Sequence, residues 1–138
     1  HITDDLDLRT KMVNKRLKKL DLIRNDTIPP ELVGSENYKT LIVGWGSTYH
    51  AISEALGRFG TKDVAFLHFK QVYPLHSNTI TYLKKAKKTV IVENNGTGQF
   101  GQLIRLQTGF DMDHKILKYN GLPFSVEELE KRLKSVLD

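Results

Sequence analysis

The fold class of this chain is indicated by one continuous stretch, Val90-Ile91-Val92-Glu93-Asn94-Asn95-Gly96-Thr97-Gly98-Gln99-Phe100-Gly101. Its first residues are apolar and β-branched, which is typical of a buried strand. A polar, glycine-rich turn follows, and the stretch ends where an amphipathic helix opens. A strand that leads through a tight turn into a helix is the repeating unit of α/β domains.

The same alternation continues on both sides of this stretch. Apolar, β-branched segments predict strands at residues 40–43, 64–69, 89–92 and 115–119. Two helices are predicted at residues 51–59, ended by Gly60, and at residues 100–106, ended by Gly109. Two more are predicted to begin after a capping Ser77 and after the capping box Ser125-Val126-Glu127-Glu128. Continuously apolar strands joined through helices predict an α/β fold of three layers, α/β/α, with a mostly parallel sheet.

The N-terminal part of the chain has a different pattern. Residues 4–24 predict a helix that Thr3 or Asp4 can cap, with an apolar stripe made of Leu6, Val13, Leu17 and Leu20. The opposite face is mostly Lys and Arg, so the stripe needs a partner surface. Residues 25–37 contain Pro29-Pro30 and Gly34 and predict an irregular connection. We therefore expect a helix and linker at residues 1–37, coming from a preceding domain, and a compact domain at residues 38–138.

Composition narrows the possible classes of protein. The sequence does not begin with Met, which suggests a segment of a longer polypeptide, and it has no signal-peptide pattern. No apolar run approaches the roughly 20 residues that span a bilayer, so no membrane partner is expected. The absence of Cys excludes disulfides and Cys-ligated clusters within this segment and fits a cytoplasmic protein.

The net charge of +5 comes largely from basic blocks at residues 11–19 and 84–88. Basic patches can bind nucleic acid, but aromatic residues do not interleave with these blocks. A solvated helix face is therefore the better interpretation, and nucleic acid is not expected as a partner.

Ligands of open α/β sheets bind beyond the carboxyl ends of the strands, which here means residues 44–48, 70–76 and 93–99. We expect these loops to cluster. Gly96, Gly98 and Gly101 have the dinucleotide-binding spacing G-x-G-x-x-G. However, the next strand does not end in the acid that would hold a ribose, and the charge of Glu93 would repel a pyrophosphate unless it points away. The alternatives left open are a nucleotide- or anion-binding module that uses this turn, and a tight turn without a ligand.

The remaining candidate residues carry weaker signals. Gly44-Trp45-Gly46-Ser47-Thr48 is a second strand-to-helix turn that could hold an anion, although a turn capped by Ser47 is the simpler interpretation. None of the histidines has metal-ligand spacing, so no metal site is predicted. No nucleophile–base arrangement stands out.

Several blocks, taken in order, resemble 2-oxoacid:ferredoxin oxidoreductase alpha subunits of the 2-oxoglutarate type. They are His1-Ile2-Thr3, Lys11-Met12-Val13, Lys15-Arg16-Leu17-Lys18-Lys19-Leu20, Leu41-Ile42-Val43-Gly44-Trp45-Gly46-Ser47-Thr48, Tyr73-Pro74-Leu75, Val92-Glu93-Asn94-Asn95-Gly96-Thr97-Gly98-Gln99 and Lys118-Tyr119-Asn120-Gly121-Leu122-Pro123-Phe124. The resemblance implies a transketolase C-terminal-like domain, the part that follows the pyrimidine-binding domain.

The resemblance also implies an enzyme complex with thiamine diphosphate, Mg²⁺ and Fe–S clusters, which converts a 2-oxoacid and CoA to an acyl-CoA with ferredoxin as electron acceptor. Asn94-Asn95 matches half of the cofactor motif, but no Gly-Asp-Gly precedes it. No catalytic residue and no cofactor therefore falls in this segment. Its implied role is architectural, against a beta subunit and its own pyrimidine-binding domain. The candidate interface residues are Gly44, Trp45, Gly46, Ser47, Thr48, Tyr73, Glu93, Asn94, Asn95, Thr97 and Gln99.

Overall fold

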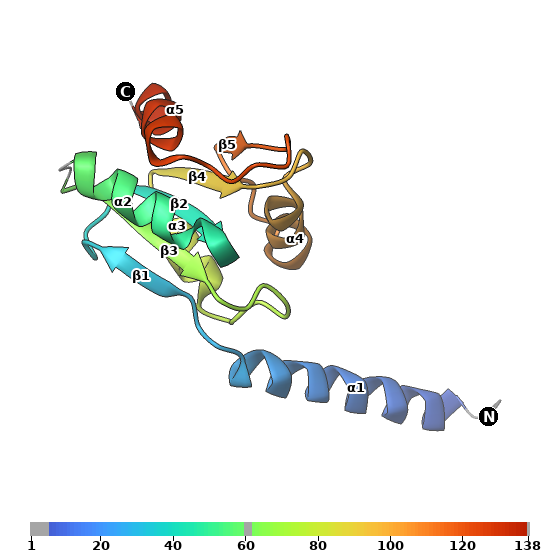
Figure 1. Cartoon of the computed structure of the whole chain (residues 1–138). Helices are drawn as coiled ribbons and strands as arrows, with labels where there is room; N and C mark the ends of the chain where they lie inside the picture. Colours follow the sequence, from blue (N-terminus) through green and yellow to red (C-terminus); the bar gives the residue numbers. More distant parts are fainter. Residues whose placement is uncertain (1–5, 60–61, 138) are drawn as a thin grey trace.

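A computed structural model describes residues 6–59 and 62–137 of the chain (Figure 1). These residues form α1 (Leu6–Asp26), β1 (Glu31–Gly34), β2 (Thr40–Trp45), the 3₁₀ turn η1 (Gly46–Thr48), α2 (Tyr49–Phe59), β3 (Val64–Phe69), α3 (Thr79–Lys85), β4 (Lys88–Glu93), α4 (Gln99–Thr108), β5 (His114–Leu117) and α5 (Val126–Leu137). The predicted caps at Thr3 and Asp4 and the predicted stop at Gly60 lie outside the described residues.

The strands form one sheet in the order β1-β3-β2-β4-β5. The strands β3, β2, β4 and β5 run parallel, and only β1 is antiparallel to its neighbour. The predicted α/β class with a mostly parallel sheet is therefore confirmed.

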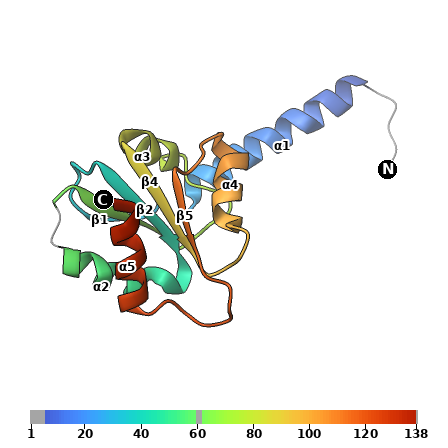
Figure 2. The same cartoon turned by 90° about the horizontal axis from the view of Figure 1, so that it is seen from above.

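Two apolar cores fill the spaces between the sheet and its helices. Alternate residues of a strand point to opposite faces, so Leu41 and Val43 enter one core and Ile42 enters the other. The first core also contains Leu83 of α3 and Ile104 of α4. The second core is closed by α2 and α5, on the opposite side of the sheet (Figure 2). This arrangement confirms the three predicted layers.

The strand β1 corrects the prediction that residues 25–37 are irregular throughout. Leu32 lies opposite Leu67, and Val33 lies opposite Phe66, in an antiparallel edge pairing with β3. The strand has only four residues and directly follows Pro29-Pro30. A segment this short does not show the alternation of apolar and polar residues by which a strand is recognised. Edge position and shortness are common together, because long exposed edges promote aggregation.

Smaller differences concern the ends of elements. The strand β2 continues to Trp45 instead of ending at residue 43, so Gly44 belongs to the sheet and lies opposite His68. Ser77 does not cap α3, whose N-cap residue is Asn78. Leu106 lies inside the predicted helix at residues 100–106 but is 80% exposed, so it does not belong to the core face of that helix. Gly109 ends α4 as predicted, with a positive φ of 76°.

The start of α5 confirms the predicted capping box. The amide of Glu128 donates a 3.1 Å hydrogen bond to the Ser125 hydroxyl. Phe124 and Leu129 are both buried in the second core, as expected of residues that flank a helix cap. The carboxylate of Glu128 also accepts a hydrogen bond from the ammonium of Lys118.

The bond from Lys118, together with other nearby donors, holds the pKa of Glu128 below its ordinary value of 4.5. A lowered folded-state pKa means that the bond stabilises the fold above the ordinary pKa and is lost as the pH falls through the lowered value. We expect Glu128→Gln to be less stable than the parent chain at about pH 7 and to lose this difference in strong acid. Urea unfolding at several pH values measures it, with the exposed Glu54→Gln as the matched control.

The helix α1 projects from the rest of the molecule (Figures 1 and 2). Among the described residues of its predicted stripe, Val13 is 52% and Leu17 is 56% exposed. No helix in the described part of the chain has the length and apolar character needed to cross a bilayer.

Candidate functional site at the carboxyl ends of the strands

The loops that follow β2 and β4 lie side by side, as predicted. The indole nitrogen of Trp45 donates a 3.3 Å hydrogen bond to the Glu93 carboxylate. The ring of Phe100, at the start of α4, lies 6.2 Å from the Trp45 ring and 4.9 Å from the Phe69 ring, both edge to face. The ends of three neighbouring strands are thus held together by aromatic packing and one shared carboxylate.

Glu93 is the centre of this arrangement. Its side chain is completely buried. The oxygen Oε1 accepts hydrogen bonds from Trp45, from the Asn95 side chain at 3.0 Å and from the Phe100 amide at 2.7 Å. The oxygen Oε2 accepts one from the Gly101 amide at 3.1 Å. The carboxylate therefore sits where the first turn of α4 presents its unpaired amides and the positive end of its dipole.

Asn95 completes the cap of the same helix. Its Oδ1 accepts hydrogen bonds from the amides of Thr97 at 3.2 Å, Gly98 at 2.7 Å and Gln99 at 3.1 Å. The amides of residues 97–101 are consequently all bound by two side chains of the preceding turn. Because so many amides are fixed by Glu93 and Asn95, the turn is rigid.

Two of the three glycines of the G-x-G-x-x-G spacing, Gly96 and Gly98, have separate local causes. Gly98 has a φ of 65°, which side-chain-bearing residues rarely adopt. A Cβ on Gly96 would lie 3.1 Å from the ring of Tyr119. A Cβ on Gly101 would make only ordinary contacts, the nearest at 3.6 Å. Turn geometry thus explains Gly98 and the packing of Tyr119 explains Gly96, whereas the position of Gly101 does not require a glycine.

These contacts argue against the nucleotide-binding interpretation of this turn. A pyrophosphate at a helix N-terminus is bound by the amides of the first turn. Here Glu93 and Asn95 already occupy those amides, and a second anion would meet the buried charge of Glu93. The α4 N-terminus therefore does not fit a dinucleotide, nor the diphosphate of a thiamine cofactor.

The turn after β2 is also satisfied internally. The Thr48 hydroxyl donates to the Trp45 carbonyl at 2.9 Å, whereas the predicted cap by Ser47 is not formed. His68, buried beneath this turn, lies with Nε2 3.1 Å from the Gly46 carbonyl oxygen. A Cβ on Gly44 would lie 2.6 Å from Ile52 Cδ1, so only glycine allows α2 to pack this closely.

The predicted interface residues fall into two groups. Gly44, Thr48 and Glu93 are buried, and Trp45 and Asn95 are partly buried. Those that reach solvent at the tips of the loops are Gly46, Ser47, Tyr73, Asn94, Thr97 and Gln99. The buried group shapes the loops, and the exposed group forms their outer surface.

Two residues of this region were missed by sequence reasoning. Phe100 was predicted only as the start of a helix, although its ring packs against the ends of two strands, at Trp45 and Phe69. Tyr119 was assigned to a strand, although it follows β5 and is 75% exposed against Gly96. The signal for Phe100 was its position at the first turn of α4, directly above the carboxyl edge. Among the described residues, no group of three or more His, Asp and Glu side chains is placed to hold a metal ion.

Comparison with known proteins gives a consistent set of relatives, although no protein-family model matches. The chain is 34% identical over 142 residues to the alpha subunit of 2-oxoacid:ferredoxin oxidoreductase 1 of Sulfurisphaera tokodaii, an alignment that covers 99% of this chain and 22% of that subunit. It is 33% identical over 100 residues to 2-oxoglutarate oxidoreductase subunit KorA of Mycobacterium tuberculosis, covering 70% of this chain and 15% of that subunit. The chain thus spans about a fifth of the length of these curated relatives or less.

Two solved structures are similar. One is the 2-oxoglutarate:ferredoxin oxidoreductase from Magnetococcus marinus with 2-oxoglutarate, coenzyme A and succinyl-CoA bound, which matches 99% of this chain and 24% of its own chain at a TM-score of 0.85 and 26% identity. The other is the alpha chain of a probable 2-oxoacid ferredoxin oxidoreductase from Thermoplasma acidophilum. It matches 79% of this chain and 97% of its own at a TM-score of 0.53 and 32% identity.

Proposed function

Because this chain belongs to the family of 2-oxoacid:ferredoxin oxidoreductase alpha subunits, we propose that it is the C-terminal, transketolase C-terminal-like domain of such a subunit. In this proposal residues 38–138, extended by β1, form the domain, and α1 leads into it from the pyrimidine-binding domain. The domain contributes to assembly and carries no catalytic group. The complete enzyme would convert a 2-oxoacid, CoA and oxidised ferredoxin to an acyl-CoA, CO₂ and reduced ferredoxin in the cytoplasm.

Thiamine diphosphate, Mg²⁺ and the Fe–S clusters would be held by other parts of this enzyme. The observation that supports this division is the closed carboxyl edge of the sheet, where Glu93 and Asn95 bind the amides that could otherwise receive a phosphate group. No reaction step is therefore assigned to this edge. Its fixed loops offer shape and hydrogen-bonding groups to another protein surface.

The composition of the loops supports a protein partner. In a chain of which 27% is charged, residues 44–48 and 93–99 contain a single charged residue, Glu93, which is buried. Their exposed groups are hydroxyls and amides, and the exposed rings of Tyr73 and Tyr119 also lie beyond strand ends. Loss of charge and enrichment in aromatic residues are typical of the centres of protein interfaces. We propose that a beta subunit and the pyrimidine-binding domain cover this surface.

Arginine substitutions at the loop tips test the proposal. With the complete alpha and beta subunits produced together, Ser47→Arg combined with Thr97→Arg is expected to weaken their association about tenfold to hundredfold, because two large charges enter an uncharged contact. Both side chains are exposed, so the fold should persist. Ser135→Arg, near the end of α5, is the matched control. Association measured by analytical ultracentrifugation that is the same for both variants would refute an interface at these loops.

Calorimetry distinguishes the remaining alternative, a nucleotide-binding module. Titration of the chain with NAD(H), ATP and CoA should give no saturable heat below about millimolar ligand, since the α4 amides are already bound. Sub-millimolar binding that Gly98→Ala abolishes would contradict the assembly role and support the alternative.

A further inference from the structure

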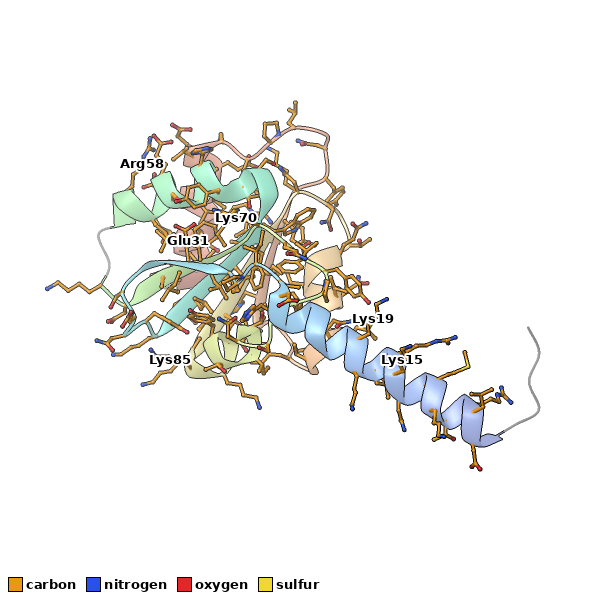
Figure 3. The ribbon with its side chains drawn as sticks, turned by 90° about the horizontal axis from the view of Figure 1, so that it is seen from below. Lys15, Lys19, Glu31, Arg58, Lys70 and Lys85 are labelled. Carbon is orange, nitrogen blue, oxygen red and sulfur yellow. The ribbon has the colours of Figure 1, made fainter. Side chains whose placement is uncertain are left out.

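The positive charge of the chain is concentrated in α1. This helix contains seven Lys and Arg against three Asp, a net charge of +4. The whole chain carries +5, so all other residues together carry only +1. The helix also projects from the sheet, and Figure 3 shows Lys15 and Lys19 on its projecting part. Contacts within the described part of the chain do not explain why the basic residues are concentrated in α1.

Among the side chains of this helix that the structure describes, four large apolar ones are exposed. Leu8 is 44% and Met12 is 45% exposed, with Val13 at 52% and Leu17 at 56%. At about 100° of rotation per residue, Leu8 and Met12 lie on one side of the helix, and Val13 and Leu17 lie roughly 140° away. Arg9 and Arg16 fall between these two apolar sides. The helix is therefore prepared for contacts on two sides, with cations between them.

We infer that α1 docks into a groove of another polypeptide of the assembly, a groove with two apolar walls and with Asp and Glu side chains between them. The inference rests on the proposed function, in that the partner is a protein of the same enzyme. Desolvation of the four apolar side chains would supply affinity, and acidic groups would pair with Arg9, Arg16 and the surrounding lysines.

The alternative occupants fit less well. A second copy of the chain offers a body, residues 27–138, of charge +3 to a helix of charge +4, so like charges would meet. A lipid surface receives one apolar face, whereas α1 presents two. Nucleic acid is commonly bound through aromatic side chains next to basic ones, and α1 contains no aromatic residue.

Photo-crosslinking in the assembled enzyme tests the inference. The photoreactive amino acid p-benzoylphenylalanine replaces Met12 or Leu17 in the complete alpha subunit, produced together with the beta subunit. Each variant should crosslink to a protein segment rich in Asp and Glu, and the two positions should reach different segments. The same probe at Glu54 of α2 is the control for nonspecific reaction. Crosslinks only to lipid, to nucleic acid or to an identical chain, or none at either position, would overturn the inference.

Charge reversal gives an independent result. Lys15→Glu with Lys19→Glu should weaken assembly about tenfold or more, with the loss reduced at high salt because the partner charges are screened. Lys84→Glu with Lys87→Glu changes the net charge equally outside α1 and should have little effect. Equal effects of the two pairs would contradict a specific site. If the α1 variants weaken assembly while Ser47→Arg with Thr97→Arg does not, the docking of α1 is supported and the loop interface is refuted. If only the loop variants weaken assembly, the loop interface is supported and the docking of α1 is refuted.

Discussion

Replacing Glu93 by alanine is expected to lower the free energy of unfolding by about 3–5 kcal/mol. The carboxylate accepts four hydrogen bonds from Trp45, Asn95, Phe100 and Gly101 and is completely buried. Without it, two buried helix amides, a partly buried indole and a partly buried amide side chain lose their acceptor. Each unsatisfied buried donor costs about 1–3 kcal/mol, reduced where the turn can relax. Guanidinium unfolding of the chain measures the change.

The variant Glu93→Gln separates the effect of the charge from the effect of the side-chain volume. In Glu93→Gln the amide oxygen can keep the three bonds of Oε1, but its NH₂ group then faces the Gly101 amide, donor to donor. We expect a loss of about 1–3 kcal/mol, between the parent and the alanine variant. Trp45 is the only tryptophan in the sequence, so its fluorescence reports on this site during the same experiment. A Glu93→Ala variant no less stable than Glu54→Ala, an exposed replacement worth at most about 0.5 kcal/mol, would refute this role.

Phe100→Ala is expected to cost about 3–5 kcal/mol, the usual range for a buried phenylalanine. The side chain is 3% exposed, and its ring contacts those of Trp45 and Phe69, so its removal leaves a cavity where three strand ends meet. Leu106→Ala is the matched control on the same helix. Leu106 is 80% exposed, so its replacement should change stability by no more than about 0.5 kcal/mol. Equal losses for both variants in thermal or chemical unfolding would show that the aromatic cluster does not stabilise the edge.

The sequence predicts the layers of this fold because buried parallel strands have an unmistakable composition. Leu41-Ile42-Val43 and Val90-Ile91-Val92 are apolar on both faces, as they must be when helices cover both sides. The strand β1 escapes prediction because Leu32 and Val33 are too few to show a period, and because its pairing partner lies more than thirty residues away. The exposure of Leu106 could not be predicted, because helical spacing alone does not tell where an apolar stripe ends.

The sequence predicted the position of the candidate site in the fold but not the hydrogen bonds within it. The rule that loops cluster at the carboxyl ends of parallel strands correctly brings Trp45 and Glu93 together. Spacing alone, however, does not distinguish a turn open to a phosphate from one closed by its own carboxylate. The charge of Glu93 predicts that it would repel a pyrophosphate, but its burial and its bonds to Phe100 and Gly101 depend on how α4 packs against the sheet. Phe100 and Ile104 of α4 pack in one core with Phe69 and Ile91, an arrangement that only the three-dimensional structure shows.

The carboxylate of Glu93 competes with dissolved phosphate compounds for the amides of α4. Tethered to the turn it binds, it acts at an effective concentration far above that of any dissolved metabolite, since tethering alone supplies about millimolar levels and a rigid tether supplies more. A free nucleotide would have to displace this built-in competitor before it reached the helix. The edge of the sheet is thereby insulated from the abundant phosphate compounds around it. A surface with that property presents the same face to its neighbours whatever the metabolic state.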